Sequence, residues 1–115
     1  MFVDIEDHEE ALIYPHLERA VSFISRALGT GGKCLVHCFA GSSRSGSCVI
    51  AYLMQSKELA YFDALRFVQS RRRVVRPNLG FGKQLIHYEE ELVRKRQEAQ
   101  HTEPMPDQEV AMDGE

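Results

Sequence analysis

The sequence predicts an α/β fold in which a short, mostly parallel β-sheet is followed by a cluster of helices. The run KCLVHC, residues 33–38, is short, apolar and preceded by glycines, which is typical of a buried strand. The segment FVDI, residues 2–5, is expected to end a second strand. Apolar side chains recur every three or four positions between residues 17 and 28, and Gly29 follows, which predicts an amphipathic helix with a glycine stop.

Three more helices are expected after this run, and together they form the helical cluster. The segment SGSCVIAYLMQS, from Ser45 onward, is apolar enough for a buried helix, and a further helix is expected over residues 61–72. The last helix begins near Gly80 and carries apolar residues on one face. We expect one domain at residues 1–94. Residues 95–115 have many acids and almost no large apolar side chains, which predicts a disordered acidic tail.

Composition excludes several classes of protein. A chain of 115 residues with 43% hydrophobic residues and a net charge of −3 is expected to be one soluble domain without a general attraction to nucleic acid. It has no apolar run of the roughly 18 to 20 residues that span a membrane. Cys34, Cys38 and Cys48 are odd in number and lack CxxC spacing, so neither a disulfide framework nor a metal site is expected. A reducing compartment fits better, namely the cytoplasm, with the nucleus as a second location.

The stretch VHCFAGSSRSG, residues 36–46, holds a cysteine and an arginine six positions apart between the predicted strand and the next helix. A glycine-bearing loop at a helix N-terminus directs backbone N–H groups at an oxyanion. Arg44 would grip two phosphoryl oxygens, and the same groups would lower the pKa of Cys38 from its free value of about 8.5 by several units. Cys38 could instead be a small buried hydrophobe, the commoner role of a cysteine. The presence of His37, Gly41 and Ser45 around the pair favours a nucleophile.

The segment HCFAGSSRS resembles the HCxxGxxRS signature of the cysteine-dependent protein phosphatases, and its AGxSRS portion is typical of their dual-specificity branch. The segments HLERAVSFISRAL, VIAYLM, ALRFVQSRR and RPNLGFGKQLIHYEEEL also resemble successive segments of that branch, so the resemblance covers about residues 3–94. It implies a partial cysteine-phosphatase fold with the phosphate-binding loop between a strand and a helix. Members of that branch usually begin earlier, with further strands. We therefore expect a truncated chain whose strand at 33–38 lacks a neighbour.

The resemblance also implies a role for each residue of the loop. Cys38 attacks phosphorus to form a phosphocysteine, which water then hydrolyses. Ser45 donates to the sulfur and makes it a better leaving group, while His37 orients the loop. No cofactor is implied. The residues expected to bind the phosphate are Phe39, Ala40, Gly41, Ser42, Ser43 and Arg44.

A general acid must protonate the leaving oxygen, and the resemblance points to Asp7. In that branch an aspartate lies about ten residues before the residue that opens the helix, here Leu17, with Asp4 and Glu6 as nearby competitors. The run DIEDHEE could also be a solvated charged segment. The resemblance further implies that Asn78 supports the phosphate loop, although it could equally cap the last helix.

The function predicted is a protein phosphatase for phosphotyrosine and for phosphoserine or phosphothreonine. Its partners are phosphorylated protein substrates, with kinases among them, and the oligomeric state stays open. A phosphoinositide or RNA-end phosphatase is the second enzyme class, but the loop lacks the lysines usual in phosphoinositide enzymes. The third alternative is a phosphate-binding pseudoenzyme or regulatory fragment with little turnover. The segment RRRVVR, residues 71–76, could recruit acidic sequence or phosphate, or could be a solvated helix end; it is poor grounds for nucleic-acid binding.

Overall fold

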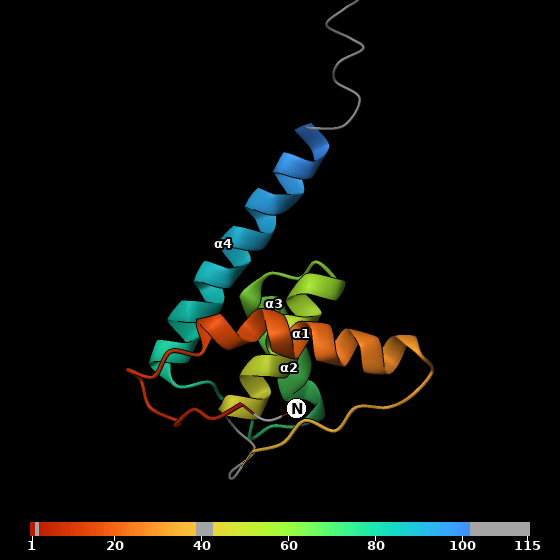
Figure 1. Cartoon of the computed structure of the whole chain (residues 1–115). Coiled ribbons are helices and arrows are strands. Elements are labelled where there is room, and N and C mark those ends of the chain that lie inside the picture. Colours follow the sequence, from red (N-terminus) through yellow and green to blue (C-terminus); the bar gives the residue numbers. More distant parts are fainter. Residues whose placement is uncertain (2, 39–42, 102–115) are drawn as a thin grey trace, which may run out of the picture.

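The computed structural model describes residues 1, 3–38 and 43–101. Four helices follow one another along this part of the chain, and all four lie where the sequence predicts helices (Figure 1). They are α1 (Tyr14–Gly29), α2 (Arg44–Ser56), α3 (Tyr61–Arg71) and α4 (Leu79–His101). α2 packs against each of the other three, and α1 lies across it. The far end of α4 projects beyond the rest of the molecule.

The hydrophobic core lies between these helices. Each helix contributes one apolar face, as its residue spacing predicts, because positions three and four apart lie on the same side of a helix. Ile13, immediately before α1, is also fully buried. The main buried side chains are Leu17 and Val21 of α1, Ile50, Ala51 and Met54 of α2, Tyr61, Ala64 and Val68 of α3, and Phe81, Leu85, Tyr88 and Leu92 of α4.

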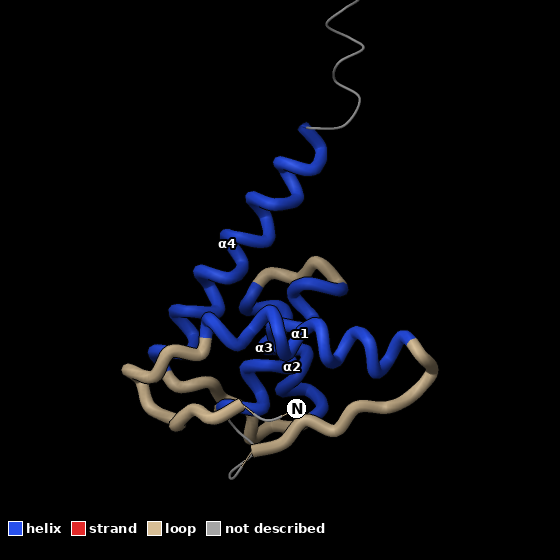
Figure 2. Tube along the Cα trace, in the orientation of Figure 1, coloured by secondary structure: helices blue, strands red, loops and turns tan. Residues whose placement is uncertain are grey.

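The prediction of a parallel β-sheet is wrong. None of the residues that the structure describes is in a strand, and both segments expected to be strands lie in loops (Figure 2). Leu35, expected in a buried strand, is 84% exposed. An apolar run becomes a strand only where a neighbouring backbone pairs with its N–H and C=O groups. Among the described residues, no backbone hydrogen bond joins residues 33–37 to another segment.

α4 is longer than the sequence suggests. Residues 95–101, which we expected in a disordered tail, form its last two turns. Two side chains tie this part of α4 to the body. Arg96 donates from Nη2 to the carbonyl of Met54 at 3.1 Å, and Lys95 Nζ lies 3.7 Å from a carboxylate oxygen of Glu18. The remainder of the predicted tail, residues 102–115, lies outside the described residues.

None of the four described helices combines the length and the apolar composition needed to cross a bilayer.

Candidate active site

Cys38 and Ser45 meet at the start of α2. The backbone N–H of Ser45 donates to Cys38 Sγ at 3.3 Å, and the Ser45 hydroxyl oxygen lies 3.3 Å from the same sulfur. The first turn of a helix presents unpaired N–H groups and partial positive charge, which favour a thiolate over a thiol. When the sulfur is ionised, the Ser45 hydroxyl is the donor of the pair. The two residues are thus brought together as the sequence predicts.

Arg44 is the first residue of α2, and its guanidinium is only partly paired. It donates from Nη1 to the backbone carbonyl of Ile5 at 3.2 Å. Its Nε is buried, and no hydrogen-bond partner for it lies among the described residues. A buried N–H without a partner costs free energy that an acceptor would recover, and phosphate oxygens match the planar fork of a guanidinium. The side chain is therefore suited to bind an oxyanion.

Ser43 fixes the end of the predicted phosphate-binding loop. Only 3% of the residue is exposed, and its carbonyl accepts hydrogen bonds from the backbone N–H of Ser47 at 2.9 Å and from its hydroxyl at 2.6 Å. The Ser43 Oγ accepts a bond from the backbone N–H of Asn78 at 2.9 Å. These bonds hold the loop end against the start of α4. The other predicted phosphate ligands, Phe39, Ala40, Gly41 and Ser42, lie outside the described residues.

Asp7 lies in the segment of residues 6–13, here called the acid loop, and is held by Asn78. The Asn78 Nδ2 donates to Asp7 Oδ1 at 2.9 Å, while Asn78 Oδ1 accepts the N–H of Phe81 at 2.8 Å and so caps α4. The Asn78 side chain therefore caps α4 and holds Asp7, whereas the bond to Ser43 comes from its backbone N–H. The competitor Asp4 lines the same cavity as Cys38, whereas Asp7 is not among the residues that line it. The bond to Asn78 instead connects Asp7 to the start of α4, and its role as the general acid stays a prediction.

His37 and Cys48 complete the set of titratable groups around the loop. His37 is exposed, and its predicted role in orienting the loop stays a prediction. Burial raises the pKa of Cys48 from an ordinary value near 9 to about 11, and the nearby Cys38 adds to the shift. Cys48 is therefore a thiol at neutral pH. The three cysteines, Cys34 included, form no disulfide.

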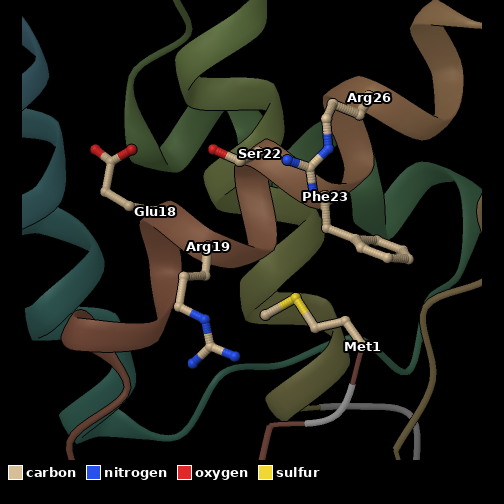
Figure 3. A pocket seen from close by; sticks show the side chains of 6 residues that line it. All are labelled: Met1, Glu18, Arg19, Ser22, Phe23 and Arg26. Carbon is tan, nitrogen blue, oxygen red and sulfur yellow. The ribbon is translucent and has the colours of Figure 1, made fainter.

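A cavity of about 490 Å³ lies beside Cys38. Residues 1, 3–5 and 13, α1, α2 and the segment 34–38 supply its walls, and Cys38, Arg44 and Ser45 are among the lining residues. A second hollow of about 390 Å³ lies on the outer face of α1 (Figure 3). That hollow is lined by Met1 and by Glu18, Arg19, Ser22, Phe23 and Arg26, which include no residue predicted for the site. The cavity beside Cys38 is thus the candidate active site.

Two groups near the site were not found from the sequence. One is the backbone carbonyl of Ile5, which accepts the bond from Arg44, and a backbone acceptor leaves no mark in a sequence. The other is Gln84 of α4, whose side chain bonds to the acid loop some 70 residues away along the chain. Its only sequence signal is its place three residues after Phe81, beside the apolar face of the helix.

Comparison with known proteins gives consistent matches over this region. A family model described as "Dual specificity phosphatase, catalytic domain" matches residues 1–91. Human dual specificity protein phosphatase 5 is 41% identical over 92 residues, which are 80% of this chain and 24% of that protein. Drosophila melanogaster dual specificity protein phosphatase MPK-4 is 46% identical over 84 residues, 73% of this chain and 22% of that protein.

Solved structures give a similar result. The crystal structure of human tyrosine phosphatase-like serine/threonine/tyrosine-interacting protein matches with a TM-score of 0.77 and 42% identity, covering 79% of this chain and 60% of that one. Human DUSP28 matches with a TM-score of 0.73 and 39% identity, covering 76% of this chain and 59% of that one. The chain thus spans about a quarter of these two curated relatives and about three fifths of these solved chains.

Proposed function

The chain belongs to the dual specificity phosphatase family, and we propose that it hydrolyses phosphotyrosine and phosphoserine or phosphothreonine through a phosphocysteine intermediate. The observation that carries this proposal is the sulfur of Cys38, held at 3.3 Å from both the N–H and the hydroxyl of Ser45 at the start of α2. A cysteine at a helix N-terminus beside an arginine is a nucleophile prepared for an anionic substrate.

The reaction divides into two displacements. In the first, the Cys38 thiolate forms a bond to phosphorus, the bond from phosphorus to the leaving oxygen breaks, and Asp7 gives its proton to that oxygen. In the second, Asp7 accepts a proton from water as the water oxygen bonds to phosphorus. The phosphorus–sulfur bond then breaks, and the Ser45 hydroxyl donates to the departing thiolate. Arg44 binds phosphoryl oxygens in both steps, which gives a partner to its buried Nε, for which the described residues supply no acceptor.

The proposed substrates are phosphorylated proteins with acidic sequence near the phosphate, phosphorylated kinases among them. Support comes from the segment between α3 and α4, where Arg72, Arg73 and Arg76 are exposed. Among the described residues, no carboxylate forms an ion pair with these arginines. Asn78, which holds Asp7, follows Arg76 by two positions, so an acidic peptide could bind there beside the active site. We place this activity in the cytoplasm and the nucleus, where thiols stay reduced.

The test is release of phosphate from an aryl phosphate by the purified 115-residue chain, compared with Cys38→Ser and Asp7→Asn. We expect Cys38→Ser to reduce turnover to the background rate, because it removes the nucleophile. With phenyl phosphate, whose leaving group needs a proton, Asp7→Asn should reduce kcat/KM by about 10² to 10³-fold, within the range by which a positioned acid accelerates proton transfer. Turnover that persists in Cys38→Ser would contradict the mechanism, and no turnover by the wild type would contradict the activity.

A second candidate is a phosphate-binding protein with little turnover. It is favoured by the bond from Arg44 to Ile5, which occupies part of the guanidinium, and by the exposed segment 33–37 that leads to the nucleophile. Vanadate binding separates the two candidates. A chain that binds vanadate at Cys38 without releasing phosphate from any aryl phosphate would be the binding protein, whereas turnover abolished by Cys38→Ser would exclude it.

A further inference from the structure

We infer that Gln84 is a positioning residue for the general acid, because its side chain clamps the C-terminal end of the acid loop onto α4. The inference rests on the proposed function, since it assigns Gln84 a role in the proton transfer by Asp7. Gln84 itself does not touch the reacting atoms; it would act through the position of the loop.

All the hydrogen-bonding capacity of the Gln84 amide is used in this clamp. Its Oε1 accepts bonds from the backbone N–H groups of Ile13 at 2.8 Å and Tyr14 at 2.9 Å. Its Nε2 donates to the carbonyl of Ala11 at 2.9 Å and to the carbonyl of Gly80, in its own helix, at 3.2 Å. A side-chain amide has two donors and two acceptor positions, so each one has a partner. A side chain with fewer groups could not make the same set.

These bonds matter because α1 has no cap of its own. The first four N–H groups of a helix lack partners within it, and the N-cap residue Ile13 makes no side-chain cap bond. Pro15 has no N–H, and the N–H of His16 bonds to the Ile13 carbonyl at 2.8 Å. The N–H groups of Ile13 and Tyr14 therefore depend on Gln84. Only 1% of Ile13 is exposed, so water would replace the lost acceptor poorly.

The acid loop lies along the start of α4 and is held at three points. Asn78 holds its N-terminal end through Asp7, as described above. At Gly80 the two backbones approach so closely that an added Cβ would lie 1.8 Å from the carbonyl oxygen of Glu9. Gln84 holds the C-terminal end. Without Gln84 the loop would keep its two other contacts but lose the one that fixes where it joins α1.

The clamp is separate from the residues that bind phosphate. Ser43, at the end of the phosphate loop, bonds to Asn78 and not to Gln84. Loss of the Gln84 amide should therefore displace the acid while leaving the oxyanion site in place. Proton donation matters most for a poor leaving group and little for an activated aryl leaving group. A positioning defect should thus depend on the leaving group, which a general loss of structure would not.

The experiment compares Gln84→Leu with Gln69→Leu as a matched control. Gln69 also donates from a part-buried amide to a backbone carbonyl, that of Val75 at 2.9 Å, but that bond lies far from the acid loop in the chain. The probes are p-nitrophenyl phosphate, phenyl phosphate and vanadate. We expect Gln84→Leu to lower kcat/KM, which reports the first displacement, by about 10-fold for phenyl phosphate and by less than about 3-fold for p-nitrophenyl phosphate, because a small displacement of a catalytic group is costly. Vanadate affinity and the control should change by less than about 2-fold.

A double-mutant cycle with Asp7→Asn decides whether Gln84 acts through the acid. In the Asp7→Asn background, Gln84→Leu should have no further effect on phenyl phosphate turnover. Equal losses for both aryl phosphates, or a full additional loss in that background, would overturn the inference while the proposed function stood. No turnover by the wild type would instead overturn the proposed function, and with it any role of Gln84 in proton transfer.

Gln84→Glu is a second variant that tests the same inference if Gln84→Leu does not fold. Glutamate keeps an acceptor for the N–H groups of Ile13 and Tyr14 but puts a carboxylate oxygen against the Ala11 carbonyl. We expect it to fold and to show the same dependence on leaving group with a smaller loss, about 3-fold for phenyl phosphate. A glutamate variant indistinguishable from wild type on phenyl phosphate would contradict a positioning role for the complete clamp.

Discussion

The two sides of the candidate site are held very differently. On one side, the acid loop and the end of the phosphate loop are bonded to α4 through Asn78 and Gln84. On the other side, residues 33–37 lead to Cys38 as a loop in which Lys33, Leu35 and His37 are exposed, beside a cavity of about 490 Å³. The described contacts of the Cys38 sulfur run to Ser45 of α2. Asp7 is thus held at the start of α4, and Cys38 contacts the start of α2 through Ser45.

This difference shows how a helical body can keep part of a catalytic arrangement without a sheet. Hydrogen bonds from the side chains of Asn78 and Gln84 hold the acid loop in position, as a rigid scaffold holds an active-site loop. The segment before Cys38 has no such support among the described residues. Local stability should therefore differ strongly between the two sides, and the predictions below test that difference in order of decreasing expected effect.

Amide hydrogen exchange should separate the two sides most clearly. We expect amides of residues 33–37 to exchange near the rate of an unfolded chain, because no backbone bond to them is found among the described residues. Amides in the buried part of α4, residues 82–92, should exchange slower by about 10³-fold or more. Mass spectrometry of peptides from the two segments measures this. Slow exchange over residues 33–37 would show that hydrogen bonds protect this segment and would contradict the difference between the two sides.

Truncating one leucine on each side of the site compares how much side-chain packing stabilises the two sides. Leu85 of α4 is 0% exposed and Leu35 is 84% exposed. Leu85→Ala should lower the free energy of unfolding by about 3 kcal/mol, the usual cost of a cavity in a packed core. Leu35→Ala should change it by less than about 0.5 kcal/mol. Urea unfolding followed by circular dichroism measures both. A large loss for Leu35→Ala would mean that residues 33–38 pack against the body in solution.

The close approach of α4 to the acid loop predicts a third effect. Gly80→Ala would place a Cβ 1.8 Å from the backbone oxygen of Glu9, and a backbone atom cannot rotate away. We expect a loss of about 2 kcal/mol and a fall in phenyl phosphate turnover, because the loop must move. Gly29→Ala is the control, since nothing lies within 4 Å of the added atom. An equally stable Gly80→Ala would show that the loop shifts without cost and is less firmly held than we infer.

The features predicted from the sequence are those set by nearby residues. The period of Leu17 and Val21, and of Phe81 and Leu85, places α1 and α4 because helix formation is local. The contact between Cys38 and Ser45 could be predicted because the two residues are only seven positions apart in the sequence. The sheet was predicted wrongly because strand pairing depends on a distant partner that the apolar run alone does not reveal.

The contacts that organise the acid loop were predicted only in part, for the same physical reason. Resemblance to the phosphatase family indicated Asp7 and Asn78, but their bond joins residues 71 positions apart. Gln84 reaches Ala11 over 73 positions, and nothing in a glutamine on a helix predicts such a partner. Contacts of this kind depend on how the helices pack, which the apolar pattern of a single sequence does not specify.

Cys48 gives a pH-dependent prediction for the side that carries the nucleophile. Its pKa is about 11 in the folded chain, raised by burial from near 9, so the folded state holds the proton more tightly than the unfolded state. The resulting stability is complete below about pH 9 and is lost between about pH 9 and pH 11. Cys48→Ala should reduce this alkaline loss by about 1 kcal/mol at pH 10. Urea unfolding at pH 7 and pH 10 measures it. If Cys48→Ala loses as much unfolding free energy between pH 7 and pH 10 as the wild type, the loss comes from ionisation of the buried tyrosines and not of Cys48.

Substitution of Gly46 in α2 should change stability least, because the gain in helix propensity opposes the cost of crowding. In Gly46→Ala the added Cβ would lie 2.6 Å from Val75 Cγ1, so the valine must shift. Alanine favours a helix over glycine by about 1 kcal/mol, while crowding costs about 1 to 3 kcal/mol. We expect a net loss of about 1 kcal/mol or less, since a side chain can move more readily than the backbone at Gly80. In a Val75→Ala background, which removes the clash, the same change should become stabilising. If Gly46→Ala destabilises both backgrounds equally, the crowding does not come from Val75.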